Sequence, residues 1–160
     1  MKIEREYTFF KLKKGDHIPF HIQDEDKLHV EAVTPPFRFN FHLTWRLSYV
    51  FGGYYRIYRL YREEKLVCSA EIVTWIPQFG FMPFDGIQIG PCVTEREERG
   101  KGYYPYLLSQ IIDIYPHKDF YMIIHETNIA SVRGVQKKGF QKWARSGKNR
   151  FGIYVKINES

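Results

Sequence analysis

The sequence is poor in cysteine and contains no long apolar run. Its 160 residues include two cysteines, Cys68 and Cys92, which stand in separate apolar segments and form no Cys-x-x-Cys pair. Such cysteines are expected to be reduced core thiols. No stretch approaches the roughly 20 apolar residues that span a bilayer, and the first residues lack the apolar core of a secretory signal. A soluble, cytoplasmic protein without a membrane partner is expected.

Repeats, linkers and low-complexity segments are also absent from the sequence, so residues 1–160 are expected to form a single domain. The formal net charge of +6 suits an anionic partner. The basic residues are interleaved with acidic ones, which is typical of a solvated surface and argues against nucleic acid as that partner. The nucleic-acid alternative predicts an affinity that falls steeply with salt. Aromatic residues make up 18% of the chain, and this excess over a minimal core is expected to line a cleft.

Two histidines near the N-terminus, His17 and His21, do not predict a metal site. Pro19 stands between them and excludes an ordinary helix, and no third ligand follows nearby. We therefore expect no metal.

The pattern of apolar residues predicts an α+β domain. Strands are expected over residues 6–13, 28–34, 54–61, 66–76, 86–94 and 120–125. Helices are expected over residues 41–50, capped by Asn40, over residues 104–115, and from Asn128 onward. A final hairpin is expected to join residues 141–145 to 151–157 through a turn at 146–149. The loop 78–85 is expected to pack on the sheet, with a substrate lid as the alternative. The sheet is expected to be mixed and largely antiparallel, with flanking helices.

One stretch of the chain, Arg99-Gly100-Lys101-Gly102-Tyr103-Tyr104, predicts an anion site between a strand and a helix. Two glycines one residue apart let the backbone turn sharply and let a ligand approach closely. The following helix directs its unpaired NH groups and its positive dipole end into this turn. Arg99 and Lys101 add formal positive charge, which suits a phosphate.

This stretch resembles the Arg/Gln-x-x-Gly-x-Gly/Ala signature of the GNAT superfamily of acyl-CoA-dependent N-acyltransferases, with Tyr104 in place of the final small residue. A second block, Asn128-Ile129-Ala130-Ser131 followed by Lys138-Gly139-Phe140, resembles the later motif of the same superfamily. The two blocks come in the expected order, separated by an apolar strand. The resemblance covers about residues 66–160, and the first 60 or so residues match no pattern of the superfamily.

The resemblance implies acetyl-CoA as the cofactor. Backbone NH groups of the glycine turn would cradle the pyrophosphate, and the strand through Cys92 and Thr94 would pair with the pantetheine arm. Asn128 would cap the later helix and is a candidate to bond the pantetheine. Arg133, Lys137 and Lys138 are either ligands of the 3′-phosphate or solvated side chains. The implied cofactor-binding set is Cys92, Val93, Thr94, Arg99, Gly100, Lys101, Gly102, Tyr103, Tyr104, Asn128 and Ser131.

The resemblance also implies catalytic roles. The backbone NH at Cys92 would polarise the thioester carbonyl. Many members carry a Tyr seven residues after the Asn, to protonate the departing thiolate. That position is Val135 here, so the proton must come from another group or from solvent. His125 is the first candidate for the base, because it ends the strand expected beside the acetyl group and an imidazole titrates near neutrality. Glu71 and Glu126 are the alternatives.

The sequence therefore predicts an acetyl-CoA-dependent N-acetyltransferase that acts on a primary amine of a small molecule. An amino sugar or a nucleotide-linked amino sugar is favoured, because aromatic faces stack on such rings. The alternatives are a non-catalytic acyl-CoA-binding module, which Val135 would explain, and an enzyme that acetylates a protein amino group. A homodimer that completes the acceptor cleft is a further expectation.

Overall fold

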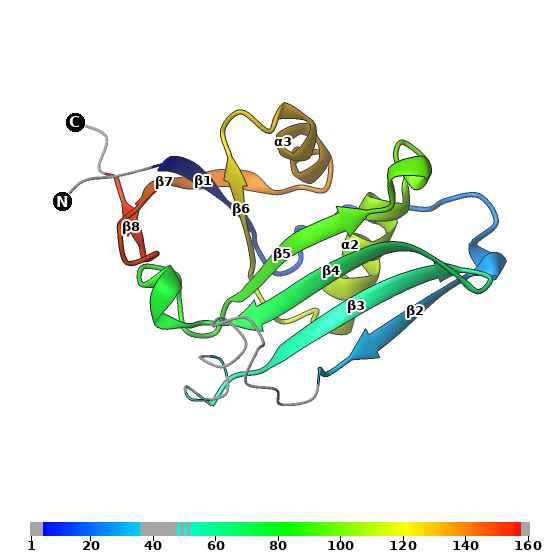
Figure 1. Cartoon of the computed structure of the whole chain (residues 1–160), viewed down its shortest axis with the longest axis horizontal. Helices are drawn as coiled ribbons and strands as arrows, with labels where there is room; N and C mark the ends of the chain where they lie inside the picture. The colour runs from blue at the N-terminus through cyan, green and yellow to red at the C-terminus, as the bar shows by residue number, and fades with distance from the viewer. Residues whose placement is uncertain (1–4, 36–47, 49, 51, 158–160) are drawn as a thin grey trace.

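The structure, a computed structural model, describes residues 5–35, 48, 50 and 52–157. Its strands form one eight-stranded sheet in the order β2-β3-β4-β5-β6-β1-β7-β8 (Figure 1). The strands are β1 Arg5–Leu12, β2 Leu28–Val33, β3 Tyr55–Arg62, β4 Lys65–Thr74, β5 Ile87–Thr94, β6 Phe120–His125, β7 Gln141–Lys148 and β8 Tyr154–Lys156. The helices are α2 Tyr103–Ile114 and α3 Ile129–Gln136, with short 3-10 turns η1 Glu25–Lys27, η2 Pro77–Phe79 and η3 Arg96–Glu98. Neighbouring strands are antiparallel except β5 and β6, which confirms the predicted α+β fold with a mixed, largely antiparallel sheet.

The helix expected over residues 41–50 lies outside the described residues, apart from positions 48 and 50. Within the described part of the chain, no helix is long and apolar enough to cross a bilayer.

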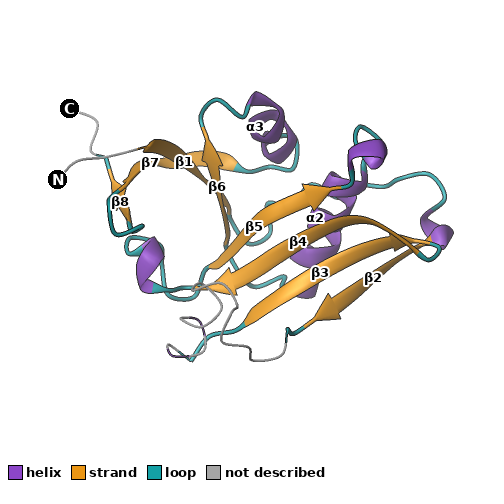
Figure 2. Cartoon of the chain, in the orientation of Figure 1, coloured by secondary structure: helices purple, strands orange, loops and turns teal. Residues whose placement is uncertain are grey.

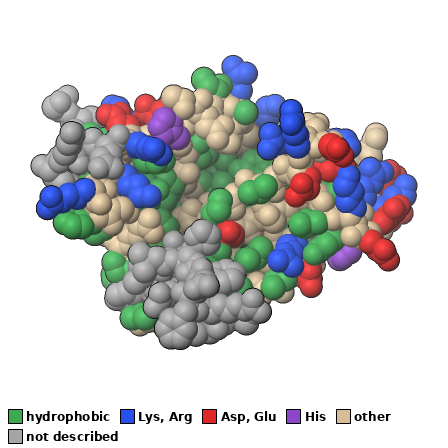
Figure 3. Space-filling view, viewed as in Figure 1, with side chains coloured by type: hydrophobic (Ala, Val, Ile, Leu, Met, Phe, Trp, Pro, Cys, Tyr) green, Lys and Arg blue, Asp and Glu red, His purple; other side chains and the backbone are tan. Residues whose placement is uncertain are grey.

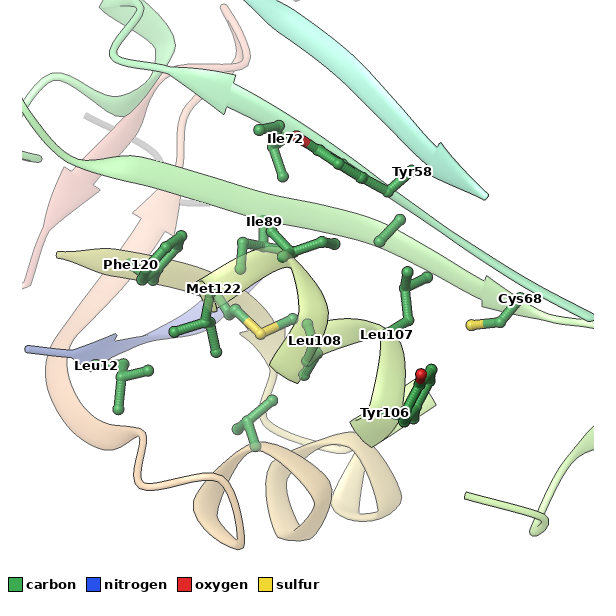
Figure 4. Packing of buried hydrophobic residues seen from close by; sticks show 14 of the residues in the cluster. Leu12, Tyr58, Cys68, Ile72, Ile89, Tyr106, Leu107, Leu108, Phe120 and Met122 are labelled. Carbon is green, nitrogen blue, oxygen red and sulfur yellow. The ribbon is translucent and has the colours of Figure 1, made fainter. Parts of the chain in front are cut away.

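Helix α2 covers one face of the sheet, which we call the α2 face (Figure 2). Its apolar residues recur at helical spacing, and Leu107 and Leu108 are completely buried against the strands (Figure 4), as is Ile111. Pro105 lies in the first turn, where its missing NH costs nothing. The predicted helix is confirmed within one residue at each end. The opposite face of the sheet has a smaller apolar cluster that includes Phe9, Tyr55 and Phe79.

The N-terminal strand β1 lies between β6 and β7. Phe9 is paired with Ile123 on one side and with Ala144 on the other. Alternate residues point to opposite faces of a strand, so Phe10 and Leu12 join the α2-face core and Phe9 joins the opposite cluster. The strand itself was predicted from its residues, but its central place in the sheet was not.

Strands β5 and β6 are paired only at Ile87–Phe120 and Gln88–Tyr121, and then diverge. Beyond these pairs β5 is irregular. Gly90 has φ of +131°, a backbone conformation that favours glycine, and the register with β4 shifts between Ala70 and Ile72. Gly and Pro inside a strand are typical of a bulge or an unpaired edge, and β5 has the bulge.

The predicted position of the C-terminal turn is wrong. Strand β7 continues through residues 146–148, because Ser146 pairs with Tyr7 of β1 on one side and with Lys156 of β8 on the other. The turn follows at residues 149–153, where the side-chain oxygen of Asn149 accepts hydrogen bonds from the backbone NH groups of Phe151 and Ile153. The local turn signal at residues 146–149 was thus overridden by strand pairing on both sides.

Candidate functional site

A cleft of about 650 Å³ opens where β5 and β6 diverge. In the space-filling view, apolar side chains form the floor of a hollow between α3 and β5, and basic side chains stand at its rim (Figure 3). The lining residues are Ile89 to Thr94 of β5, Arg99 and Tyr104 at the start of α2, Met122 to His125 of β6, and Asn128, Ala130 and Ser131 at the start of α3. Many of the residues that the sequence singled out are therefore brought together here.

The glycine turn forms the wall of a second cavity of about 440 Å³, which shares Thr94, Arg99 and Tyr104 with the cleft. Gly100 and Gly102 have φ of +78° and +85°, so both positions favour glycine. The rest of this cavity is lined by the segment from residue 18 to residue 20, by Glu98, Tyr103 and Pro105, and by Gly134, Lys137 and Lys138. The cleft and the cavity thus adjoin at the start of α2.

Charge in the glycine turn is organised by Glu98, which is buried. Its carboxylate accepts hydrogen bonds from Lys101 at 2.8 Å and from Lys65 at 2.7 Å. These two bonds, that from Lys101 first, lower the pKa of Glu98 to about 2. Lys101 lines a separate cavity together with Arg62 and Tyr103. The positive charge that faces the 440 Å³ cavity therefore comes from Arg99, Lys137 and Lys138.

Lys138 is nearly completely buried, with an exposed fraction of 2%. Its amine donates a hydrogen bond to the carbonyl oxygen of Ile18 at 3.3 Å and lies 4.2 Å from the ring centroid of Phe20. Burial lowers the pKa of this amine. The segment before β2 thus closes over the later basic block, a contact that no local pattern predicts.

The thiol of Cys92 lies inside the cleft, where burial raises its pKa. It therefore stays protonated at neutral pH and is not a nucleophile. Beside it, the Tyr104 hydroxyl donates a long hydrogen bond of 3.8 Å to the sulfur of Met122. Val135 is completely buried in the α2-face core and does not line the cleft.

The other two sequence candidates lie at the mouth of the cleft. His125 is exposed at the end of β6, and its Nδ1 lies 2.7 Å from the hydroxyl of Thr127. The ring of Tyr7 meets the His125 ring edge-on, with 5.4 Å between their centroids. Asn128 caps α3 by accepting a hydrogen bond from the backbone NH of Ser131 at 3.2 Å, which confirms the predicted cap.

Glu71 lies in a third pocket, of about 290 Å³, on the face of the sheet opposite α2. The pocket is lined by Glu71, Gln78, Phe79, Gln88, Gly90, Pro91, Ile123 and Tyr154. Gly90, Pro91 and Ile123 also line the cleft, so the two spaces meet at the bulge. Tyr55 donates a hydrogen bond to the Glu71 carboxylate. Burial, followed by this contact, raises the pKa of Tyr55, so the phenol remains a donor.

The remaining acidic and imidazole candidates are engaged elsewhere. Glu126 accepts a hydrogen bond from Thr8 at 3.3 Å and pairs with Arg145. His17 contacts Ser109 and Asp113 of α2, whereas His21 contacts Glu25. The two histidines are thus directed to separate partners.

Comparison of the sequence with protein-family models and with curated proteins finds no match. The structure is similar to several solved structures. A GNAT-family protein from Novosphingobium aromaticivorans aligns with 90% of this chain at a TM-score of 0.55 and 12% identity. A GCN5-related N-acetyltransferase from Kribbella flavida aligns with 90% at 0.58 and 8% identity. A tandem GNAT protein from the clavulanic acid biosynthesis pathway, solved without acetyl-CoA, aligns with 100% at 0.59 and 13% identity. The chain has the fold of the GNAT superfamily.

The chain spans 63%, 57% and 55% of the lengths of these three proteins. The similarity therefore covers only part of each of these three proteins. Within that fold, the glycine turn, the start of α3 and the diverging strands are the parts that build the cleft. Sequence motifs located all three parts. They missed Tyr55, which contacts Glu71, and Phe79 and Tyr154, which line the third pocket, because no motif marks an aromatic residue that only tertiary folding brings to this place.

Glu98→Gln tests the charge arrangement of the turn. The Glu98 carboxylate has a pKa of about 2 in the folded protein against 4.5 ordinarily, so its ion pairs stabilise the fold above about pH 4.5 and stop doing so as the pH falls through 2. We expect the variant to unfold at lower urea than the wild type at pH 7, and the difference to shrink steadily between pH 5 and pH 3. Glu97→Gln is the control, because Glu97 is 87% exposed. An equal difference at pH 7 and pH 3 would contradict the assignment.

Proposed function

We propose that the protein is an acetyl-CoA-dependent N-acetyltransferase that acylates a primary amine. The observation that supports this most strongly is that three spaces adjoin through shared lining residues: the basic cavity at the glycine turn, the cleft between β5 and β6, and the pocket that contains Glu71. The basic cavity and the cleft would bind a long anionic thioester, and the pocket would bind a small amine. The two sites adjoin at Gly90 and Pro91. When bound, acetyl-CoA supplies an acetyl group activated as a thioester.

The residues present suit that cofactor. The glycine turn presents the first NH groups of α2. A Cβ atom added at Gly100 would have no other atom within 4 Å, so a ligand has room to approach there. Arg99 and Lys137 offer positive charge for phosphates, whereas the Lys138 amine is buried beneath Ile18 and Phe20. Beyond the bulge, β5 pairs with β4 along one side, while its other side borders the cleft, where an amide-rich chain adds as a strand would. In this proposal the Cys92 NH polarises the thioester carbonyl.

Glu71 is the base that the geometry favours over His125. Glu71 lines the small pocket beyond the bulge, and Tyr55 orients its carboxylate by donating a hydrogen bond. His125 lines the cleft but not this pocket. An amine in the pocket binds to Glu71 as an ammonium ion, and the carboxylate then holds the proton that the amine must lose before it attacks.

The acceptor that we propose is a small amine with a flat polar body, such as an amino sugar. Phe79 and Tyr154 give the pocket two aromatic rings, and Gln78 and Gln88 supply side-chain amides. Rings stack on the faces of a sugar and amides hydrogen-bond its hydroxyl groups. The same chemistry accepts a nucleotide-linked amino sugar whose nucleotide extends out of the pocket. Acetylation of a protein amino group and acyl-CoA binding without turnover are the alternatives.

The first test is calorimetric titration of acetyl-CoA into the wild type and into Arg99→Glu. We expect micromolar binding by the wild type and at least about tenfold weaker binding by the variant, because a charge-assisted phosphate contact becomes a repulsion. Arg96→Glu is the matched control, since Arg96 is exposed and lines none of the three spaces. Absence of wild-type binding would refute the proposed function.

Glu71→Gln and His125→Ala separate the two candidate bases. We expect Glu71→Gln to lower kcat by about 10²- to 10⁴-fold, the usual contribution of a positioned base, while acetyl-CoA affinity stays unchanged. His125→Ala should retain kcat within a few-fold. Initial rates at saturating amine, measured as release of CoA thiol, decide between them. The reverse result would return the role to His125.

An acceptor panel tests the proposed substrate class. Glucosamine, a UDP-linked amino sugar and a lysine-containing peptide would be compared by kcat/KM at one fixed acetyl-CoA concentration. We expect an amino sugar to be at least tenfold better than the peptide, because the pocket of about 290 Å³ encloses a single ring. Preference for the peptide would support the protein-acetylation alternative, and acetyl-CoA binding with no turnover on any amine would support the binding module.

A further inference from the structure

The residues at positions 104 and 135 depart from the GNAT signature on adjoining parts of the structure. Tyr104 stands where the signature has a small residue, and Val135 stands where a tyrosine is expected. The neighbour of Val135 in α3, Gly134, faces the Tyr104 ring, and a Cβ added there would lie 3.5 Å from the ring. The Tyr104 ring therefore packs against α3 one residue before position 135, whereas Val135 itself is buried in the α2-face core.

We propose that the Tyr104 hydroxyl donates a hydrogen bond to the sulfur of CoA and thereby stabilises the departing thiolate. This inference rests on the proposed function, because it assigns a role toward the same cofactor. It adds a catalytic residue from the first turn of α2, at a position that the sequence motif reserves for close approach of backbone to phosphate.

The surroundings of the hydroxyl leave its proton available. Its hydrogen bond to the Met122 sulfur is 3.8 Å long, and a thioether is a weak acceptor. The thiol of Cys92 is its other polar neighbour, and Cys68 lies farther along the same face. Burial raises the pKa of both thiols, so both stay neutral beside the phenol at neutral pH. A thiolate entering the cleft is a far stronger acceptor than either sulfur.

Three other side chains that line the cleft already have partners. The hydroxyl of Thr94 contacts the Cys68 sulfur at 3.3 Å, and the Arg99 Nε donates to the carbonyl oxygen of Thr94 at 3.3 Å. The His125 Nδ1 contacts Thr127 at 2.7 Å. Tyr104, in contrast, lies in both the cleft and the phosphate cavity, next to Cys92, whose NH is the proposed carbonyl-binding group.

The proton and electron balance assigns each residue one task. Glu71 takes one proton from the bound ammonium ion before attack, and the nitrogen releases its second proton to solvent after the carbon–nitrogen bond forms. The carbon–sulfur bond breaks, and its electron pair stays on sulfur, where it accepts the hydrogen bond from Tyr104. Burial raises the pKa of Tyr104, so the phenol keeps its proton. The sulfur is protonated by solvent on release. Tyr104 is thus a donor that lowers the barrier without itself being ionised.

The decisive experiment compares the binding of CoA and of desulfo-CoA to the wild type and to Tyr104→Phe. At pH 9, where a larger fraction of the CoA thiol is ionised than at pH 7, the wild type should bind CoA about tenfold or more tightly relative to desulfo-CoA, and this preference should be smaller at pH 7. Tyr104→Phe should lose the preference, because it lacks only the hydroxyl. Tyr106→Phe is the control: Tyr106 is a buried residue of the same helix that lines neither space.

The outcomes are separable. An unchanged CoA preference in Tyr104→Phe would overturn the inference and leave the hydroxyl with a packing role only. Failure of the wild type to bind either ligand would overturn it together with the proposed function. A lost preference without turnover on any amine would support the inference while removing the enzymatic role. In an active enzyme, Tyr104→Phe should lower kcat by about 10- to 100-fold with the KM for acetyl-CoA unchanged.

Discussion

The separation of β5 from β6 after two residue pairs is the constraint on which the candidate site depends. A continuous sheet would satisfy the inner edges of both strands and leave no space between them. Here the φ of +131° at Gly90 and the register shift opposite β4 turn β5 away, and its edge borders a cleft. Backbone groups along such an edge favour a strand-like ligand, because unpaired donors and acceptors are costly to bury. A local irregularity in one strand thus creates the binding surface.

The cleft also adjoins spaces on both faces of the sheet. On the α2 face, the glycine turn and basic residues line a cavity together with Glu98, which pairs with Lys65 and Lys101. On the opposite face, Glu71 and aromatic rings line a small pocket. The cleft and this pocket share Gly90 and Pro91. In the proposed function, an anionic and a cationic ligand would approach from opposite faces, and the bulge would bring their reacting groups together.

The N-terminal strand shows why part of the site was not predictable. Periodicity located β1 within one residue at each end, but local sequence carries no information on which strands it will pair with. Only the fold places Tyr7 against His125 and Thr8 against Glu126. The predicted turn of the C-terminal hairpin was wrong for a related reason. Residues 146–148 have a turn-forming composition, but pairing with β1 and β8 holds them in a strand.

Some properties follow from the sequence alone, because they depend on residues close together in the chain. These are the helix α2 with its proline-tolerant first turn, the need for glycine at positions 100 and 102, the bulge at Gly90, and the cap by Asn128. The tertiary structure decided the rest: the pairing of Tyr55 with Glu71, the burial of Lys138 beneath residues 18–20, and the approach of Tyr104 to α3. Each of these joins side chains far apart in sequence, and their meeting depends on how the strands and helices pack against one another.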